Sequence, residues 1–220
     1  NNRYHTRFMM SKTPHHWAVA AALGASMLLA GCATGPNANP RDPLEPYNRA
    51  VFKFNDALDN AVLEPVATGY KNVTPAPVRT AVTNFFSNLG DLWSAINNAL
   101  QLNGEGTYNS VVRFTTNTVL GLGGLIDMAS AMDIERHKQD FGLTMGRWGM
   151  PSGAYVVWPL LGPSTVRDSA GMVVDWQGDL VGYVNDVPAR NSLYALRVVN
   201  TRANLLSTTS LVESAALDKY

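Results

Sequence analysis

Apolar side chains recur every three or four residues through most of the chain beyond Asp42. The first stripe consists of Leu44, Tyr47, Val51, Phe54, Leu58 and Val62. Because an α-helix has 3.6 residues per turn, these six share one face of a helix of about 20 residues. Asp42 is suited to cap this helix, Pro43 to its first position and Glu45 to a capping box. We expect the helix to end near Pro65 and to pack through its apolar face.

Similar stripes predict helices over most of the remaining chain. They begin at Thr74-Pro75 and at Asp91, cover residues 105–120, extend from Ser164 or Thr165 to about 182, and cover 188–206. A shorter helical piece ends at Met132, and the charge run of residues 133–140 is predicted to be a solvated surface turn. Alternation typical of strands is poor, with at most a short hairpin near residues 154–158. The sequence therefore predicts an all-α fold.

Residues 142–163 interrupt this pattern, because glycine and aromatic residues dominate them. The glycines are Gly142, Gly146, Gly149, Gly153 and Gly162, with Trp148 and Trp158 between them. We expect a long irregular loop here. The aromatic set Trp148, Tyr155, Trp158, Trp176 and Tyr183 is compatible with core packing and with a belt at a bilayer interface.

The first 31 residues have the three-part pattern of a secretory signal. Arg3, Arg7 and Lys12 make a basic start, and residues 17–30 are uncharged and mostly apolar. This apolar run is at the short end of the range that spans a bilayer. We therefore predict a cleaved signal rather than a permanent transmembrane helix.

The end of this segment, Leu29-Ala30-Gly31-Cys32, resembles the lipobox of bacterial lipoproteins. Cleavage is predicted between Gly31 and Cys32, with a diacylglycerol on the thiol and an acyl chain on the new amino group. Two or three chains anchor a protein firmly, whereas one does so only marginally. Because Cys32 is the only cysteine, an internal disulfide is excluded.

The residues after Cys32 are predicted to form a tether and one domain. Residues 32–41 are small, polar and proline-containing, which is typical of a flexible tether, and residues 42–220 are the right length for a single domain. Lipoprotein sorting generally uses Asp after the cysteine for inner-membrane retention. Ala33 occupies this position, so its identity favours the outer membrane.

The composition argues against nucleic-acid binding and against several kinds of enzyme. All 17 acidic residues but only 14 basic ones follow Cys32, so this part has a formal charge of −3 and no polybasic patch. Its single histidine, His137, lies in the charge run and lacks a nucleophile elbow nearby. With the only cysteine acylated, zinc sites of His and Cys and Cys-His pairs are excluded. We predict no catalytic residues, no metal and no cofactor other than the acyl chains on Cys32.

Short motifs recur in a fixed order from Asp42 onward. They are Asp42-Pro43-Leu44-Glu45, Tyr47-Asn48-Arg49, Phe54-Asn55, Glu64-Pro65-Val66-Ala67, Val78-Arg79, Asn84-Phe85, Arg113-Phe114, Asn117-Thr118, Gly121 to Asp127, Asp140-Phe141-Gly142, Thr144, Gly146, Trp148-Gly149, Trp158-Pro159, Gly162 to Thr165, Arg167-Asp168, Arg202-Ala203 and Leu205-Leu206. In content and order the set resembles the VacJ/MlaA family of outer-membrane lipoproteins. Departures from its pattern are Leu102 for glycine, Leu143 for glutamine, Ala154 for proline and Ser207 for aspartate.

The resemblance implies a ring-like domain of amphipathic helices around a channel, lying in the periplasmic leaflet of the outer membrane. It implies a transport protein that is not an enzyme. Phospholipid mislocalised to the outer leaflet would pass through the channel to a soluble periplasmic carrier, which maintains lipid asymmetry. It also implies complexes with trimeric porins. The alternatives are a structural envelope lipoprotein without transport activity and a phospholipid hydrolase.

Two groups of residues are candidates for roles in such a channel. Asn109, Thr116 and Asn117 could line it, although ordinary contact between helices explains them equally well. The glycine-rich loop of residues 142–163 is a candidate gate, with its five glycines as hinges and Trp148 and Trp158 as bulky rings at the pore. The alternative is that its glycines only let helices cross closely.

Overall fold

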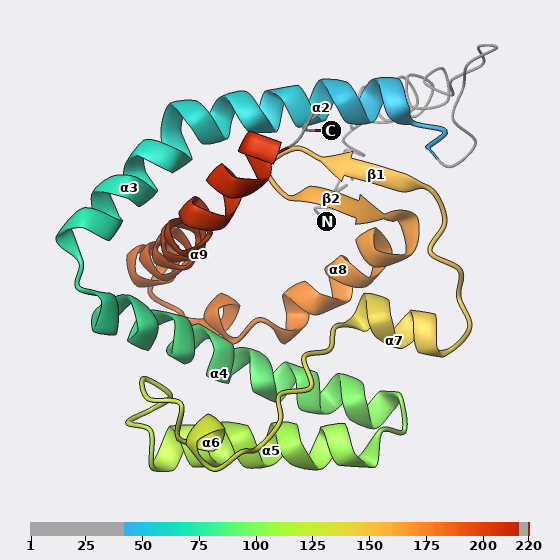
Figure 1. Ribbon diagram of the computed structural model, residues 1–220. Helices are drawn as coiled ribbons and strands as arrows, with labels where there is room; N and C mark the ends of the chain where they lie inside the picture. The colour runs from blue at the N-terminus through green and yellow to red at the C-terminus, as the bar shows by residue number, and fades with distance from the viewer. Residues whose placement is uncertain (1–41, 216–219) are drawn as a thin grey trace, which may run out of the picture.

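The computed structural model describes residues 42–215 and Tyr220. The predicted signal of residues 1–31, the acylated Cys32 and the tether up to residue 41 lie outside the described residues. Helix makes up 72% of the structure and strand 5%, which confirms the prediction of an almost wholly helical fold. The elements follow one another around a ring (Figure 1).

The chain order of the elements is simple. They are α2 (Glu45–Leu58), the π-helical turn η1 (Asp59–Leu63), α3 (Glu64–Val73), α4 (Ala76–Leu100), α5 (Gly104–Val119), α6 (Met128–Ala131), α7 (Phe141–Arg147), β1 (Tyr155–Trp158), β2 (Gly162–Thr165), α8 (Val166–Gly178), the 3-10 turn η2 (Leu180–Tyr183) and α9 (Val187–Ala215). The strands pair as an antiparallel hairpin, with Tyr155 opposite Thr165 and Trp158 opposite Gly162. The short hairpin predicted near residues 154–158 is thereby confirmed.

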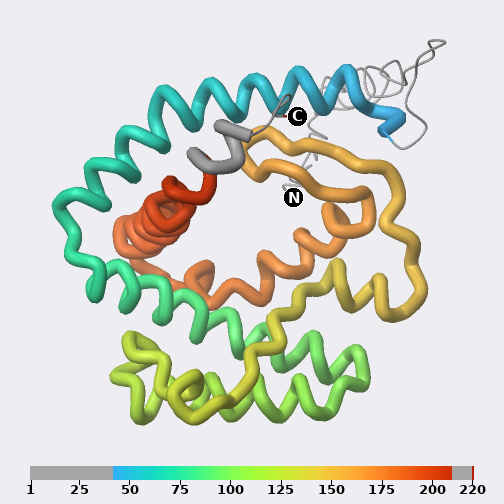
Figure 2. Tube along the Cα trace, in the orientation of Figure 1, coloured from blue at the N-terminus to red at the C-terminus, as the bar shows by residue number. Residues whose placement is uncertain are grey.

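The ring is closed by elements that are distant in sequence. In Figures 1 and 2, α2 and α3 form one long side and α4 the opposite side, while α7, the hairpin and α8 complete the circuit. The hairpin contacts α2 through β1, and α9 packs against α3 and α4. Helix α5 packs along α4 on the outer side of the ring, with α6 beside it.

The first helix is longer than predicted, and its start differs. α2 passes directly through η1 into α3, so the helical path continues beyond Pro65 to Val73. Proline has no N–H and disturbs the preceding helical turn, and here a π turn absorbs this disturbance instead of ending the helix. Asp42 is not the cap either. Its carboxylate accepts a hydrogen bond from Asn48 Nδ2 at 2.9 Å, and Leu44 takes the capping position without a side-chain bond.

The helices predicted to begin at Thr74-Pro75 and at Asp91 are one helix, α4. Asp91 was expected to start a helix but instead lies buried in the middle of one. Its carboxylate Oδ1 lies 3.1 Å from Arg136 Nε. An ion pair of this kind satisfies the buried carboxylate without any need to cap a backbone N–H.

Two segments predicted to be irregular or solvated are ordered by packing. The glycine-rich loop begins with α7, which Asp140 caps by accepting a hydrogen bond from Leu143 N at 2.7 Å. The charge run 133–140 lies extended against α4, where Ser94 Oγ accepts from Gln139 N at 3.2 Å. The prediction of a long irregular loop is therefore wrong where α7 and the hairpin form, and the charge run is an extended segment rather than a turn, although most of its side chains are exposed as predicted. Polar backbone and side-chain contacts, which carry no periodic signal, order both segments.

Polar residues occupy many of the best-buried positions of the fold. On α2 the fully buried residue is Asn48, whereas Phe54 is 54% exposed and Val62 48%. The predicted packing face is therefore wrong at Phe54 and Val62, while Leu44, Tyr47, Val51 and Leu58 are half-buried. The same inversion recurs elsewhere, with buried asparagines at 88, 97, 98, 117 and 200.

Large apolar side chains lie on the surface in corresponding abundance. They include Leu102, Val119, Leu122, Leu160 and Trp176, each more than half exposed. Apolar exposure on this scale marks a surface that meets lipid or another protein. Within residues 42–215, no helix combines the length and apolar character needed to cross a membrane.

Candidate functional site

Two adjoining cavities lie on the side of α4 that faces α8 and α9, the inner side of the ring (Figure 1). The larger cavity, of about 490 Å³, is bounded by α4, α9, Asp175 of α8 and residues 136–140. The smaller cavity, of about 330 Å³, lies between α4, residues 172–180 and Arg197 of α9. Both are lined by Phe86, Gly90, Trp93, Asp175 and Arg197, so they adjoin, and we refer to the two together as the hollow.

The two cavities differ in the residues that line them. Most residues around the larger one are polar or charged, among them Thr83, Ser87, Lys138, Asn200 and Asn204. The smaller one is lined mainly by apolar residues, which are Phe86, Leu89, Trp93, Met172, Trp176 and Leu180. The accessible wall of each cavity is nevertheless mainly apolar, so the hollow is amphipathic in the sense that polar and charged groups border apolar walls.

Three cationic side chains line the larger cavity, and two of them are paired with carboxylates. Arg136 lies 3.1 Å from Asp91, and Arg197 donates to Asp179 at 2.6 Å. For Lys138 the described part of the chain offers no hydrogen bond or ion pair, and its side chain is exposed. Lys138 is therefore the lining cation that remains available to a ligand.

A chain of amide and hydroxyl groups joins α3, α4 and α9 at one end of this cavity. Asn200 Nδ2 donates to Thr83 Oγ1 at 2.8 Å, and Asn204 Nδ2 donates to the same oxygen at 2.9 Å. Tyr70 of α3 donates its hydroxyl to Asn200 Oδ1 at 3.0 Å. The buried Asn200 side chain is thereby satisfied through both its donor and its acceptor, and it joins the three helices.

The wall shared by both cavities is fixed by Asp175 and Gly178 of α8. Asp175 Oδ1 accepts from Trp93 Nε1 at 2.7 Å and from Phe141 N at 2.8 Å. Gly178 lies against the Trp93 ring, where an added Cβ would come within 2.1 Å of a ring carbon. Only glycine therefore allows α8 to approach this tryptophan so closely.

Behind the larger cavity, a buried ionic network joins α4, α5 and the segment around α6. Arg113 is 2% exposed and donates to both carboxylate oxygens of Asp127, at 2.8 and 2.9 Å. Burial raises the pKa of Asp91 above its usual value, although Arg136 and Arg113 lie beside it. Burial would also raise the pKa of Asp127, but hydrogen bonds from Ser130 and Asn117 and the charge of Arg113 lower it to about 2.

The residues of α5 that were predicted as candidates to line a channel do not lie at these cavities. Helix α5 is on the outer side of α4, so Asn109, Thr116 and Asn117 do not line the hollow inside the ring. Asn117 is buried, and its side-chain Nδ2 donates to Asp127 Oδ1 at 3.0 Å, while its side-chain Oδ1 accepts from Ala129 N at 2.8 Å. Asn109 contacts His137. For Asn117 and Asn109, contact between neighbouring segments is the correct explanation.

The candidate hinge glycines divide into two groups. Gly142 and Gly146 lie within α7 and pack on α8, where an added Cβ would come within 2.7 Å of Asp168 and 2.6 Å of Arg167. Gly142 allows α7 and α8 to cross closely, since the Asp168 backbone is also near, whereas Gly146 leaves room for the Arg167 guanidinium. Gly149, Gly153 and Gly162 have φ of +94°, +73° and +83°, a region that favours glycine. A hinge role stays a prediction for these three.

The tryptophans of this region are exposed and held by their ring nitrogens. Trp148 Nε1 donates to Leu100 O at 3.1 Å, and Trp158 Nε1 donates to Ser169 Oγ at 2.7 Å. Trp148, Trp158, Trp176 and Tyr183 are all exposed, and Tyr155 is half-buried. Core packing is therefore the wrong interpretation for the four exposed rings.

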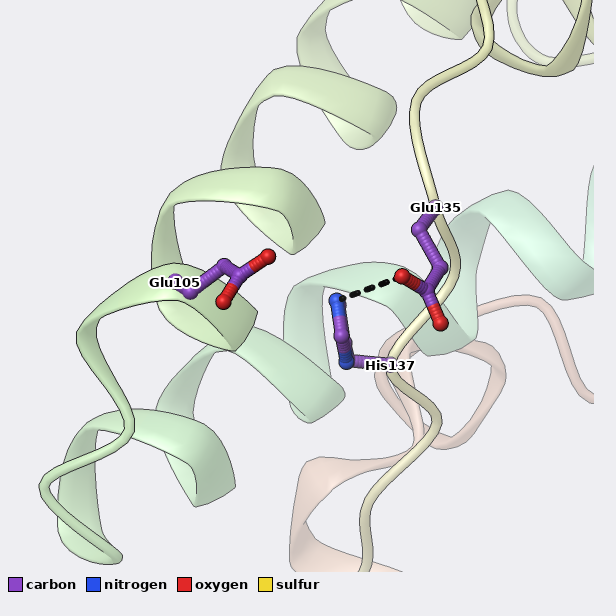
Figure 3. Close-up of side chains that lie close together, drawn as sticks. All are labelled: Glu105, Glu135 and His137. Carbon is purple, nitrogen blue, oxygen red and sulfur yellow. Dashed lines mark ion pairs between the residues drawn. The ribbon is translucent and has the colours of Figure 1, made fainter.

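One group of side chains has the spacing of a metal site. Figure 3 shows Glu105, Glu135 and His137, whose potential ligand atoms lie within 4.8 Å of one another. Both glutamates are exposed, and His137 Nε2 lies 3.2 Å from the Asn109 amide and 3.9 Å from Glu135. Asn109 thus already holds the imidazole, and exposed acidic groups often lie close together without an ion. None of the three lines the hollow.

Sequence reasoning did not identify the residues of the hollow as site residues. The sequence nevertheless contains a pattern that could have identified them. One polar face of α9 is formed by residues at steps of three, one and three, which are Arg197, Asn200, Thr201 and Asn204. Thr83, Ser87, Asp91 and Ser94 make a matching polar face on α4. Two polar stripes at helical spacing, each on a helix otherwise rich in apolar residues, indicate a polar interior.

The sequence and the structure are similar to those of known proteins. A relative from Rickettsia typhi, an uncharacterized protein, is 43% identical over 133 residues, which are 60% of this chain and 53% of the relative; the match thus spans about half of that relative's length. The Escherichia coli K12 protein named intermembrane phospholipid transport system lipoprotein MlaA is 33% identical over 209 residues, 91% of this chain and 81% of the relative. The Haemophilus influenzae protein of the same name is 32% identical, covering 90% and 82%.

A solved structure agrees with these sequence relatives. It is described as the structural basis for maintenance of bacterial outer membrane lipid asymmetry, and it matches with a TM-score of 0.69 and 33% sequence identity over 80% of this chain and 90% of the other. The family model described as MlaA lipoprotein matches residues 40–220, which is most of the chain. The chain therefore belongs to the MlaA lipoprotein family.

Proposed function

We propose that this protein removes phospholipid from the outer leaflet of the outer membrane, through the hollow inside its ring, and thereby maintains lipid asymmetry. It is a transport protein and not an enzyme. The observation that carries the proposal is the amphipathic hollow, in which polar and charged groups border apolar walls, within a ring that exposes many large apolar side chains. A phospholipid has the same division between head group and acyl chains.

The position of the protein follows from the same features. Lipid on Cys32 would anchor the chain in the periplasmic leaflet of the outer membrane. The exposed Trp148, Trp158, Trp176 and Tyr183 would lie at the level of the lipid head groups, where such rings are enriched. The relatives named as parts of a phospholipid transport system support a soluble periplasmic carrier as the receiving partner. A trimeric porin is proposed as the membrane partner on the family resemblance.

The proposal can be tested with a variant that fills the hollow. Gly90 lines both cavities, and an added Cβ there has no atom within 4 Å, so the larger side chain of Gly90→Trp should project into the hollow. Gly69 also lies in a helix with open space beside it but lines neither cavity, so Gly69→Trp is the matched control.

The measurement is the amount of phosphatidylethanolamine that an amine-reactive, membrane-impermeant reagent labels on intact cells. Cells lacking the protein should show more surface phosphatidylethanolamine than wild-type cells. The wild-type protein and Gly69→Trp should restore the low level, and Gly90→Trp should not. Equal labelling of cells with and without the protein would contradict the proposed function.

A further inference from the structure

We infer that Lys138 binds the phosphate of the phospholipid head group in the larger cavity. This inference rests on the proposed function and assigns a binding residue within that site. Lys138 lines the larger cavity, whose accessible wall is mainly apolar, and does not line the smaller one. A phosphate at Lys138 would therefore leave the acyl chains close to apolar walls.

The backbone on both sides of Lys138 is fixed to α4. His137 O accepts a hydrogen bond from Asn98 Nδ2 at 3.0 Å. Gln139 N donates to Ser94 Oγ at 3.2 Å, and Ser94 Oγ donates back to Gln139 O at 3.4 Å. Lys138 is thus presented from a held segment, and less freedom is lost when its ammonium group meets a ligand.

The other charged groups of the larger cavity are already engaged. Arg136 and Arg197 are paired with carboxylates, as described above. Asp140 accepts from the backbone of α7, and Asp175 accepts from Trp93 and Phe141. Asp140 and Asp175 keep their negative charge, but neither forms an ion pair with Lys138. An ammonium group without a carboxylate partner, lining a hollow with an adjoining apolar cavity, fits a phosphate that carries acyl chains.

The experiment compares a short-chain phospholipid with a ligand that lacks its phosphate-containing head group and with a ligand that lacks its acylated glycerol. Binding to the purified full-length, acylated protein in detergent is measured by calorimetry with dihexanoyl phosphatidylethanolamine, dihexanoylglycerol and inorganic phosphate. The variants are Lys138→Gln, which removes the charge, and Lys138→Arg, which keeps it. Lys53→Gln is the matched control, because Lys53 is exposed on α2 and lines neither cavity.

We expect Lys138→Gln to weaken binding of the phospholipid by about tenfold, the effect of losing a charge-assisted hydrogen bond. Its affinity for dihexanoylglycerol should stay unchanged. Lys138→Arg should retain most of the affinity for the phospholipid, and Lys53→Gln should retain all of it. Inorganic phosphate should bind far more weakly than the phospholipid.

Three outcomes would overturn the inference. They are an unchanged phospholipid affinity in Lys138→Gln, an equal loss for dihexanoylglycerol, and inorganic phosphate binding as tightly as the phospholipid, which would indicate a site for the free anion. If the wild type binds phospholipid while Lys138→Gln is unaffected, only this inference fails. If the wild type binds none of the phospholipid, the proposed function fails with it.

Discussion

Replacing Asn48 by alanine tests whether polar contacts hold this ring together. The Asn48 side chain is fully buried and joins α2 to the hairpin that closes the circuit. Its Nδ2 donates to Asp42 Oδ1 at 2.9 Å and to Tyr155 O at 3.1 Å, and its Oδ1 accepts from Val157 N at 2.8 Å. All three bonds would be lost in Asn48→Ala.

The size of the effect follows from the groups left behind. Val157 is 1% exposed, so its N–H would be buried without a partner. An unsatisfied buried group costs about 1–3 kcal/mol, and the weakened contacts of Tyr155 O and Asp42 bring the loss of unfolding free energy to about 2–4 kcal/mol. At about 2–4 °C per kcal/mol for a domain of this size, the melting temperature should fall by roughly 4–16 °C.

The assay is thermal unfolding of the detergent-solubilised protein, followed by circular dichroism. Phe54→Ser is the matched comparison, because Phe54 lies on the same helix, is large and apolar, and is 54% exposed. It should cost about 1 kcal/mol or less, since substitutions at exposed positions usually have small effects. The reasoning is refuted if Phe54→Ser lowers the melting temperature more than Asn48→Ala does.

Three further predictions concern the anchor, the buried network and a helix crossing. Cys32→Ser should abolish labelling by a palmitate analogue in cells, and label retained on this variant would exclude Cys32 as the acylation site. Because the pKa of Asp127 is lowered in the folded protein, its carboxylate contributes about 2 kcal/mol to the free energy of unfolding above its ordinary pKa, and this contribution is lost as the pH falls toward 2. The free energies of unfolding of the wild type and Asp127→Asn, measured by chemical denaturation, should therefore differ at pH 6 and converge at about pH 2. Gly171→Ala should destabilise the protein by about 1–3 kcal/mol because its Cβ would lie 2.5 Å from Gly142 N, whereas Gly69→Ala, with open space, should not.

Sequence patterns predicted the helices well and their packing poorly. The extent of α5 and the cap of α8, where Thr165 accepts from Asp168 N at 3.1 Å, were predictable from local rules. Burial was not. Apolar periodicity assigns the core to the apolar face, but this assumption fails for Phe54 because the ring hides polar groups and exposes apolar ones.

The residues of the hollow were harder to predict than the family. Lys138 lies in a charge run, and exposed charge runs are usually solvated. Its role depends on hydrogen bonds from Ser94 and Asn98 that join segments about 40 residues apart. Such contacts leave no period in the sequence. The polar stripe of α9 can be recognised from its helical spacing in the sequence. A cavity is identified only when the structure places this stripe opposite the polar stripe of α4.

The most direct test of the central claim is the phospholipid that co-purifies with the protein. Native mass spectrometry of the wild type and of Gly69→Trp, extracted from membranes in mild detergent, should show bound phospholipid. Gly90→Trp, whose ring would fill the hollow, should show little or none while melting at the same temperature. Equal amounts of bound phospholipid in Gly90→Trp and Gly69→Trp would contradict the account, because the lipid would then bind outside the hollow.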